Sequence, residues 1–387
     1  MKVLALSPYH GGSHERFLNE WQARSAHTFE IVSLPARHFK WRMRQAPVGL
    51  SQMAQRLAHA GQRFDVWWTT SLCNVAELRG LLPPAYRELP NCTYFHENQL
   101  IYPSRSIERD QAQGWDVNFP LSNWTTCLAS NVCWFNSEFN LHSLKDGLNQ
   151  LLAKMPDERH LETLETILQR SSIQPPGIDY KLFADRAGNK DPEKPLTIAW
   201  VGRWEHDKRP DLFFDALSLL QKKGVAFQLV CLGQHFHHIP QEFSKARLEF
   251  SEQVVHFGHL ASAADYASML SGCDVVVSTA EHEFFGIALL EAVASGCVPL
   301  APNRLVYPDL YPNECLYQSS TDGDIVREVA AKLEQLAEEK QRRGSLLELH
   351  RMWQLAELAH RYDWSQRASA LDRALEELVT NENRHVE

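Results

Sequence analysis

A strand followed by a buried helix, over residues 275–296, constrains the fold of this chain more than any other stretch. Residues 275–279 form a short run rich in β-branched side chains, which predicts a buried parallel strand that ends in a loop. From about Gly286 to Ser295, apolar side chains cover most of a helix circumference, and Gly296 is placed to end that helix. Buried strands that alternate with buried helices indicate an α/β protein.

Two glutamates in this segment suggest a binding site. Glu291 lies in the middle of the predicted buried helix, where an ionised carboxylate is costly unless it is hydrogen-bonded. Glu283 lies in the loop before the helix, and Gly286 between them lets a ligand approach the helix N-terminus, which suits a phosphate. The spacing is compatible with a nucleotide-sugar site, with one glutamate on the sugar and the other on the ribose. Alternatively, Glu283 begins the helix and Glu291 pairs with a neighbouring cation.

Length and composition limit the class of protein. A chain of 387 residues exceeds one ordinary core, so two domains of roughly 180 residues are expected. The 44% hydrophobic and 22% charged residues are typical of soluble globular proteins, and the apolar runs are shorter than the roughly 20 residues of a membrane span. The N-terminus turns polar too early for a signal peptide, and the eight cysteines form no Cys-x-x-Cys pair. We therefore expect a cytoplasmic protein with reduced thiols.

The first half begins with strand, glycine loop and helix. The strand over residues 2–6 leads into Gly11 and Gly12, which either contribute to a site at the carboxyl end of the sheet or form a simple turn. No Gly-x-Gly-x-x-Gly pattern follows, so a dinucleotide cofactor is not supported.

A basic and aromatic stretch stands out because the chain as a whole carries a formal charge of −9. Basic residues interleaved with rings suit phosphates and unstacked bases. A solvated loop whose aromatics pack inward is the alternative, and a helix is expected only later, near residues 51–60. The predicted nucleic-acid contacts in this stretch are Arg37, Phe39, Lys40, Trp41, Arg42 and Arg44.

Four polar residues follow the predicted strand over residues 92–95. His96 is the side chain best suited to polar contact with a reacting sugar, although a lone histidine is often structural. Glu97, Asn98 and Gln99 follow it, and we predict that they face a nucleic-acid acceptor.

The second half repeats the strand and helix alternation. Residues 184–195 are polar, with glycine and two prolines, and predict a linker between domains at 1–183 and 196–360. After the strand over residues 196–201, Gly202 opens a loop with Arg203 and Lys208, where a diphosphate needs cations if no metal supplies them.

The sequence predicts no metal and no cofactor. Asp322 and Asp324 form the only Asp-x-Asp, but they directly precede a helical pattern and are better explained by helix capping. His235, His237 and His238 lack a neighbouring cysteine or acid cluster, which favours a surface loop over a zinc site.

With Gly202, Arg203, Lys208, Phe257–His259 and Glu283-x7-Glu291 in this order, residues 173–380 resemble the retaining family 4 glycosyltransferases. The resemblance implies a GT-B fold, in which two Rossmann-like domains face each other across a cleft and the C-terminal helix, here 361–387, crosses back to the first domain. It also implies that Arg203 and Lys208 hold the donor diphosphate without a metal. The implied donor site consists of Gly11, Gly12, Gly202, Arg203, Lys208, Phe257, Gly258, His259, Leu260, Glu283, Phe284, Phe285, Gly286, Ile287 and Glu291.

The first half is similar to a narrower family. The stretches SPYHGGSHERFLNEW, SLPARHFKWRMR, YFHENQLIYP and VCWFNSEFN resemble the tRNA-queuosine α-mannosyltransferases over residues 1–180. This resemblance implies that mannose passes from GDP-mannose to queuosine at the wobble position of aspartate tRNA. Front-face attack is expected, with catalytic roles for His96, Arg203, Lys208 and Glu283. Two alternatives remain: a glycosyltransferase with a lipid or small-metabolite acceptor and a GDP- or UDP-sugar, and a non-catalytic nucleotide-sugar or RNA-binding protein.

Overall fold

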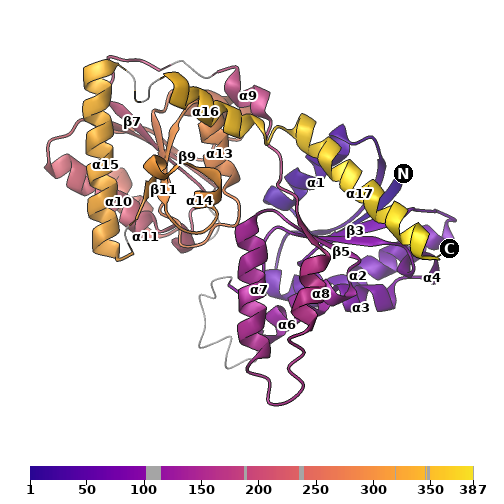
Figure 1. Cartoon of the computed structure of the whole chain (residues 1–387). Helices are drawn as coiled ribbons and strands as arrows, with labels where there is room; N and C mark the ends of the chain where they lie inside the picture. Colours follow the sequence, from indigo (N-terminus) through magenta and orange to yellow (C-terminus); the bar gives the residue numbers. More distant parts are fainter. Residues whose placement is uncertain are drawn as a thin grey trace. The chain divides into compact units, whose positions relative to one another are not determined.

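The computed structural model divides the chain into two compact units (Figure 1). Unit 1 consists of Met1–Gly177 together with Trp364–Glu387, and unit 2 consists of Ile178–Asp363. The structure describes residues 1–101, 115–186, 190–234, 239–318, 320–344, 346 and 349–386. The predicted domain boundary at residue 183 lies beyond Gly177.

Unit 1 is built on a parallel six-stranded sheet in the order β2-β1-β3-β4-β5-β6. Its central strands are largely buried, as expected of a sheet covered on both faces. Its strands are β1 (Lys2–His10), β2 (Thr28–Pro35), β3 (Val66–Thr70), β4 (Asn91–Phe95), β5 (Val132–Phe135) and β6 (Ser171–Ile173). Its helices are α1 (Gly12–Arg24), α2 (Phe39–His59), α3 (Val75–Leu81), α4 (Pro84–Arg87), α6 (Trp115–Ala129), α7 (Glu138–Leu152), α8 (Thr163–Gln169) and α17 (Trp364–Val386).

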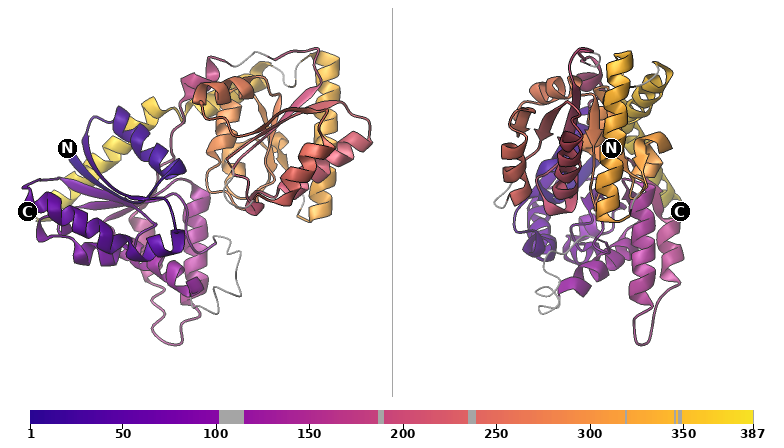
Figure 2. Two further views of the ribbon diagram at one scale, coloured as in Figure 1. Left: turned by 180° about the vertical axis from the view of Figure 1, so that it is seen from behind. Right: turned by 90° about the vertical axis from the view of Figure 1, so that its left-hand side faces the viewer.

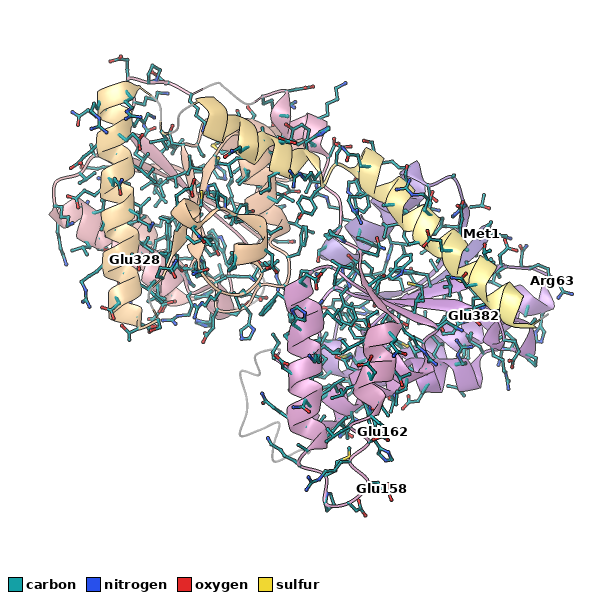
Figure 3. The ribbon with its side chains drawn as sticks, viewed as in Figure 1. Met1, Arg63, Glu158, Glu162, Glu328 and Glu382 are labelled. Carbon is teal, nitrogen blue, oxygen red and sulfur yellow. The ribbon has the colours of Figure 1, made fainter. Side chains whose placement is uncertain are left out.

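The C-terminal helix α17 belongs to unit 1, as predicted, and packs against α1 (Figure 1). Asp372 is the main polar anchor, because its buried carboxylate accepts hydrogen bonds from Trp21 Nε1 at 2.8 Å, Ser25 Oγ at 2.7 Å and Ala26 N at 2.8 Å. Near the end of α17, the labelled Glu382 accepts from Asn131 Nδ2 at 2.8 Å (Figure 3).

Unit 2 is a second parallel sheet, in the order β12-β11-β10-β7-β8-β9. The chain runs from β7 outward through β8 and β9, then returns to β10 on the other side of β7. The strand order therefore reverses between β7 and β10, and such a switch point is where ligands bind in open α/β sheets. The strands are β7 (Leu196–Val201), β8 (Phe227–Leu232), β9 (Val254–Gly258), β10 (Val275–Val277), β11 (Val298–Pro302) and β12 (Leu316–Tyr317).

Helices cover this second sheet, and α10 and α15 pack side by side (Figure 2). Lys340 of α15 donates to Asp274 Oδ2 at 2.5 Å in a buried ion pair, and the same oxygen accepts from Thr197 N at 2.8 Å, so the helix is tied to the sheet. The helical segments are α9 (Tyr180–Ala184), η1 (His206–Lys208), α10 (Pro210–Lys222), α11 (Gln241–Glu249), α12 (Ala263–Ser271), α13 (Ile287–Ala294), α14 (Tyr307–Leu310), η2 (Asn313–Cys315), α15 (Asp322–Arg343) and α16 (Leu349–His360).

Helix α2 begins much earlier than the sequence predicted. It starts at Phe39, directly after His38 in a left-handed conformation, and therefore includes most of the basic stretch and Pro47. Apolar side chains of its inner face pack into the core of unit 1, among them Ala46, Leu50 and Ala54. The early start occurs because this burial outweighs the local cost of a proline inside a helix. Among the described residues, none of the helices is long and apolar enough to cross a membrane.

Candidate active site

The carboxyl ends of β7, β8 and β9 are bound closely together. Gly202 N donates to Leu232 O at 3.1 Å, and Gly233 N donates to Gly258 O at 3.2 Å. A Cβ atom at Gly233 would lie 1.9 Å from Gly202 O, so only glycine fits there. Backbone hydrogen bonds and a close backbone approach therefore hold the ends of these three strands together.

Lys208 joins the loop after β7 to the loop after β10. Its Nζ donates to His282 O at 2.6 Å and to Glu283 Oε2 at 3.1 Å, and it lies 3.6 Å from Asp207 Oδ2. Thr279 Oγ1 donates to the Lys208 carbonyl at 3.0 Å, which fixes the backbone beside the ammonium group. Two predicted site residues, Lys208 and Glu283, therefore meet at the switch point between β7 and β10.

The N-terminus of α13 lies next to this pair. Gly286 precedes the helix with φ 82°, a conformation that favours glycine, and a Cβ there would lie 3.6 Å from Glu283 Cγ. Glu291 lies inside α13 and is 3% exposed, as predicted for a buried carboxylate. Phe284 and Phe285 are buried, and Ile287 begins the helix. One short segment therefore contains two glutamates and a helix N-terminus, and Lys208, from the loop after β7, contacts the first of these glutamates.

Arg203 occupies the same loop as Lys208 but is placed differently. Its side chain is 50% exposed, and its guanidinium lies 3.6 Å from Glu205. Because a surface ion pair of this kind is weak, exchanging it for a contact with a phosphate costs little.

The predicted base-contacting residues lie at the end of β9. Phe257 packs edge-on against Trp204, with ring centroids 5.2 Å apart. Gly258 has φ 143°, His259 is exposed, and Leu260 is partly buried. They lie at the same carboxyl edge of the sheet as the switch-point loops.

Sequence reasoning missed a group of tyrosines behind the Glu283 loop. Tyr307 Oη lies 2.7 Å from Ser278 Oγ, and Tyr317 Oη donates to Ser278 O at 3.2 Å. Burial raises the pKa of the Tyr307 phenol well above its usual value, and the nearby Glu283 charge raises it further, so the phenol stays protonated. The only signal in the sequence was the position of Tyr307 shortly after a strand end.

The Asp-x-Asp segment begins a helix, as predicted. Thr321 caps α15 and accepts from Asp324 N, while Asp322 pairs with Arg209 at 2.7 Å. Hydrogen bonding to Arg209 lowers the pKa of Asp322 below its usual value. In the described part of the chain, no group of three histidine, cysteine or acidic side chains could hold a metal ion. The histidines at 235, 237 and 238 lie outside the described residues.

In unit 1, His96 follows β4 and packs among other rings. Its ring centroid lies 4.2 Å from that of His14, 4.5 Å from Tyr94 and 5.1 Å from Phe17. Burial lowers the pKa of His96 well below its usual value, and the neighbouring His14 lowers it further. His96 is therefore a neutral imidazole at physiological pH.

Other predicted residues of unit 1 have structural explanations. A Cβ at Gly11 would lie 2.4 Å from Ala36 Cβ, so this glycine permits a close approach of two chain segments, whereas the space around Gly12 is open and its φ is 57°. Asn98 is fully buried, and its amide donates to Asn140 Oδ1 and Ser143 Oγ, both at 2.9 Å. Asn98 therefore holds its own loop and is not exposed to a nucleic acid.

The neighbours of Asn98 are also tied to the protein, but through their backbones. Glu97 O accepts from Ser71 Oγ at 3.0 Å, and Gln99 N donates to Asn123 Oδ1 at 2.7 Å. Their side chains are partly buried.

The basic stretch separates into an outer and an inner side because it is helical. Trp41 is 64% exposed, and the exposed Arg44 places its guanidinium 5.4 Å from the Phe119 ring centroid. Arg42 is only 8% exposed, which corrects its prediction as a nucleic-acid contact, and Phe39 packs edge-on against Tyr9. The other predicted cations of the stretch remain at least partly exposed and, together with Trp41, are here called the basic α2 face: Arg37, just before the helix, and Lys40, Trp41 and Arg44 within it.

Comparison with known proteins decides the family. Residues 2–178 match the family model described as tRNA-queuosine alpha-mannosyltransferase N-terminal, and residues 183–348 match glycosyl transferases group 1. The tRNA-queuosine alpha-mannosyltransferase of Drosophila melanogaster is 36% identical over 330 residues, which cover 82% of this chain and 84% of that protein. This chain belongs to the tRNA-queuosine alpha-mannosyltransferase family.

More distant relatives match part of the sequence or the fold alone. The D-inositol 3-phosphate glycosyltransferase of Paenarthrobacter aurescens is 27% identical over 41% of each chain. Sucrose-phosphate synthase from Thermosynechococcus elongatus superimposes with a TM-score of 0.70 at 15% identity, covering 98% of this chain and 100% of that one. Anabaena HepE in complex with UDP gives 0.67 at 14% identity, covering 97% and 100%. These likenesses confirm the predicted GT-B fold.

Proposed function

We propose that the protein transfers mannose from GDP-mannose to the queuosine at the wobble position of aspartate tRNA. The observation that carries this proposal is the Lys208–Glu283 pair at the switch point of unit 2, in a chain that belongs to the family. The family supports the queuosine-containing tRNA and the nucleotide sugar, whereas the guanine base and the particular tRNA are our assignment.

On the donor side, each residue at the switch point of unit 2 has a separate role. Lys208 and the N-terminus of α13 bind the diphosphate, since both offer positive charge and N–H donors. The exposed Arg203 guanidinium adds a bidentate contact with the diphosphate. Glu283 accepts hydrogen bonds from the transferred mannose, and Glu291 accepts them from the ribose hydroxyls.

The reaction needs no enzyme nucleophile if the acceptor attacks from the face that the diphosphate leaves. The bond between the anomeric carbon and the diphosphate oxygen breaks, and a bond from that carbon to the acceptor oxygen forms. The acceptor hydroxyl gives its proton to the departing diphosphate, whose developing charge Lys208 and the α13 N-terminus stabilise. His96 contributes a neutral imidazole that positions a sugar hydroxyl.

On the acceptor side, the basic α2 face supplies the contacts that a protein of net charge −9 needs for tRNA. Cations there neutralise phosphates, and the exposed Trp41 ring provides a stacking surface for an unpaired anticodon-loop base. We place the protein in the cytoplasm, where tRNA is modified and where its eight buried cysteines remain free thiols.

The test is to incubate the protein with bulk tRNA in four separate reactions, which contain GDP-mannose, GDP-glucose, UDP-glucose or UDP-galactose as the donor. The tRNA is then digested to nucleosides, which are weighed by mass spectrometry. The proposal expects a hexose on queuosine in the reaction with GDP-mannose and in none of the other three. Transfer to a lipid or a small metabolite, with none to tRNA, would replace the proposed acceptor.

A further inference from the structure

His282 contacts Lys208 through its backbone and directly precedes Glu283, yet its side chain has no part in the contacts described above. Its backbone carbonyl accepts from Lys208 Nζ at 2.6 Å, and Glu283 follows it in the chain. The imidazole itself makes no hydrogen bond to any residue that the structure describes, and its Nδ1 is shielded from solvent. The ring as a whole remains partly exposed, so its Nε2 edge is open.

This arrangement favours one tautomer of the ring. A buried N–H without an acceptor is rarer in proteins than a buried acceptor without a donor. The proton of the neutral ring therefore belongs on Nε2, which makes the open edge a hydrogen-bond donor and the shielded Nδ1 the acceptor.

The ring is neutral although charged groups surround it. Burial lowers the pKa of His282, and Lys208 and Arg304 lower it further, while Asp207 and Glu281 act in the opposite direction. A neutral N–H adds little to the binding of a dianionic diphosphate, for which Lys208 already supplies a full charge. It is better suited to an uncharged oxygen.

We propose that His282 Nε2 donates a hydrogen bond to a hydroxyl group of the hexose that is transferred. The assignment follows from the place of His282, which is covalently next to Glu283 and hydrogen-bonded to Lys208, and from the open donor edge of its ring. It rests on the proposed function in one respect, that the ligand at this switch point is a nucleotide sugar. His282 is then a contact for the sugar and not for the nucleotide.

Two substitutions separate the hydrogen bond from the shape of the ring. His282→Phe keeps a planar ring but removes the donor, and His282→Asn restores a neutral N–H donor. Loss of one hydrogen bond to a neutral group should lower kcat/KM for GDP-mannose about threefold to tenfold in His282→Phe, with a smaller loss in His282→Asn. His142→Ala, at an exposed position on α7, is the control that should leave kcat/KM unchanged.

The affinity for GDP, measured by calorimetry, decides which part of the donor His282 contacts. GDP contains the diphosphate but no hexose, so its affinity should be the same in wild type and His282→Phe. An equal fall in GDP affinity would assign the imidazole to the diphosphate or to loop structure, and unchanged kcat/KM in His282→Phe would remove it from the site. Failure of the wild type to bind GDP or to use GDP-mannose would instead contradict the proposed function.

Discussion

Replacing Lys208 by alanine tests the donor site most sharply. In the free protein Nζ makes hydrogen bonds to a carbonyl and a carboxylate, at 2.6 and 3.1 Å, and its side chain is 14% exposed. In the complex we expect it to reach the diphosphate. The truncation removes the charge that stabilises the leaving group and leaves the Glu283 carboxylate without its lysine.

The size of the effect follows from these interactions. Hydrogen bonds to charged groups contribute about 1.5–3 kcal/mol each. The expected loss of transition-state stabilisation is therefore about 2–4 kcal/mol, or roughly 30-fold to 900-fold in kcat/KM, since each 1.36 kcal/mol is a factor of ten. Steady-state transfer of labelled mannose to tRNA measures it.

A matched control separates the role of Lys208 from the removal of any one positive charge. Lys223 forms a surface ion pair with Glu334, away from the switch point, and Lys223→Ala should change kcat/KM by less than about twofold. If Lys208→Ala retained near-wild-type kcat/KM while remaining folded by circular dichroism, the assignment of the diphosphate site would be refuted.

Four further outcomes are expected. Changing the three cations of the basic α2 face to glutamine should weaken tRNA binding and lower the salt slope by about one for each phosphate that the variant no longer neutralises, with GDP-mannose binding unchanged. Asp372→Ala should lower the free energy of unfolding in urea by about 3 kcal/mol, because three donors lose their acceptor, whereas the exposed Glu377→Ala should change it little. Folding lowers the pKa of His96, so its contribution to stability is complete above the unfolded pKa of about 6.5 and is lost as the pH falls toward the lowered value. The free energy of unfolding in urea should therefore fall between pH 7 and pH 5, which bracket the unfolded pKa. His96→Phe should make this fall smaller. A chelator should change the transfer rate by less than about twofold, because Lys208 and the α13 N-terminus take the place of a metal.

The strand, loop and helix over residues 275–296 could be predicted because the information for them is local. Strand, loop and helix occur within one short stretch, and each step of the argument uses neighbours in the chain. The buried position of Glu291 and the loop position of Glu283 both follow from the helical periodicity of residues 286–295.

Residues whose role depends on distant partners could not be predicted in this way. Asn98 resembles an exposed loop residue in sequence, but Asn140 and Ser143 lie more than forty positions later and bury its amide. Tyr307 reaches Ser278 across 29 positions of the chain. No local pattern identifies such partners.

Arg42 illustrates a different failure, in which the type of element was misjudged. A helix was expected only near residues 51–60, so all cations of the preceding stretch were treated as loop residues that can contact a nucleic acid. In a helix that begins at Phe39, Arg42 lies on the same side as Ala46, one turn further along, and is carried inward with it.

The central claim is that queuosine in tRNA is the acceptor, and one measurement tests it directly. Aspartate tRNA is prepared in two forms that differ only in carrying queuosine or guanosine at the wobble position. Each is incubated with the protein and GDP-mannose, digested to nucleosides and weighed. The account predicts that queuosine gains one hexose and that the guanosine tRNA gains none, whereas unmodified queuosine or equal transfer to both tRNAs would contradict it.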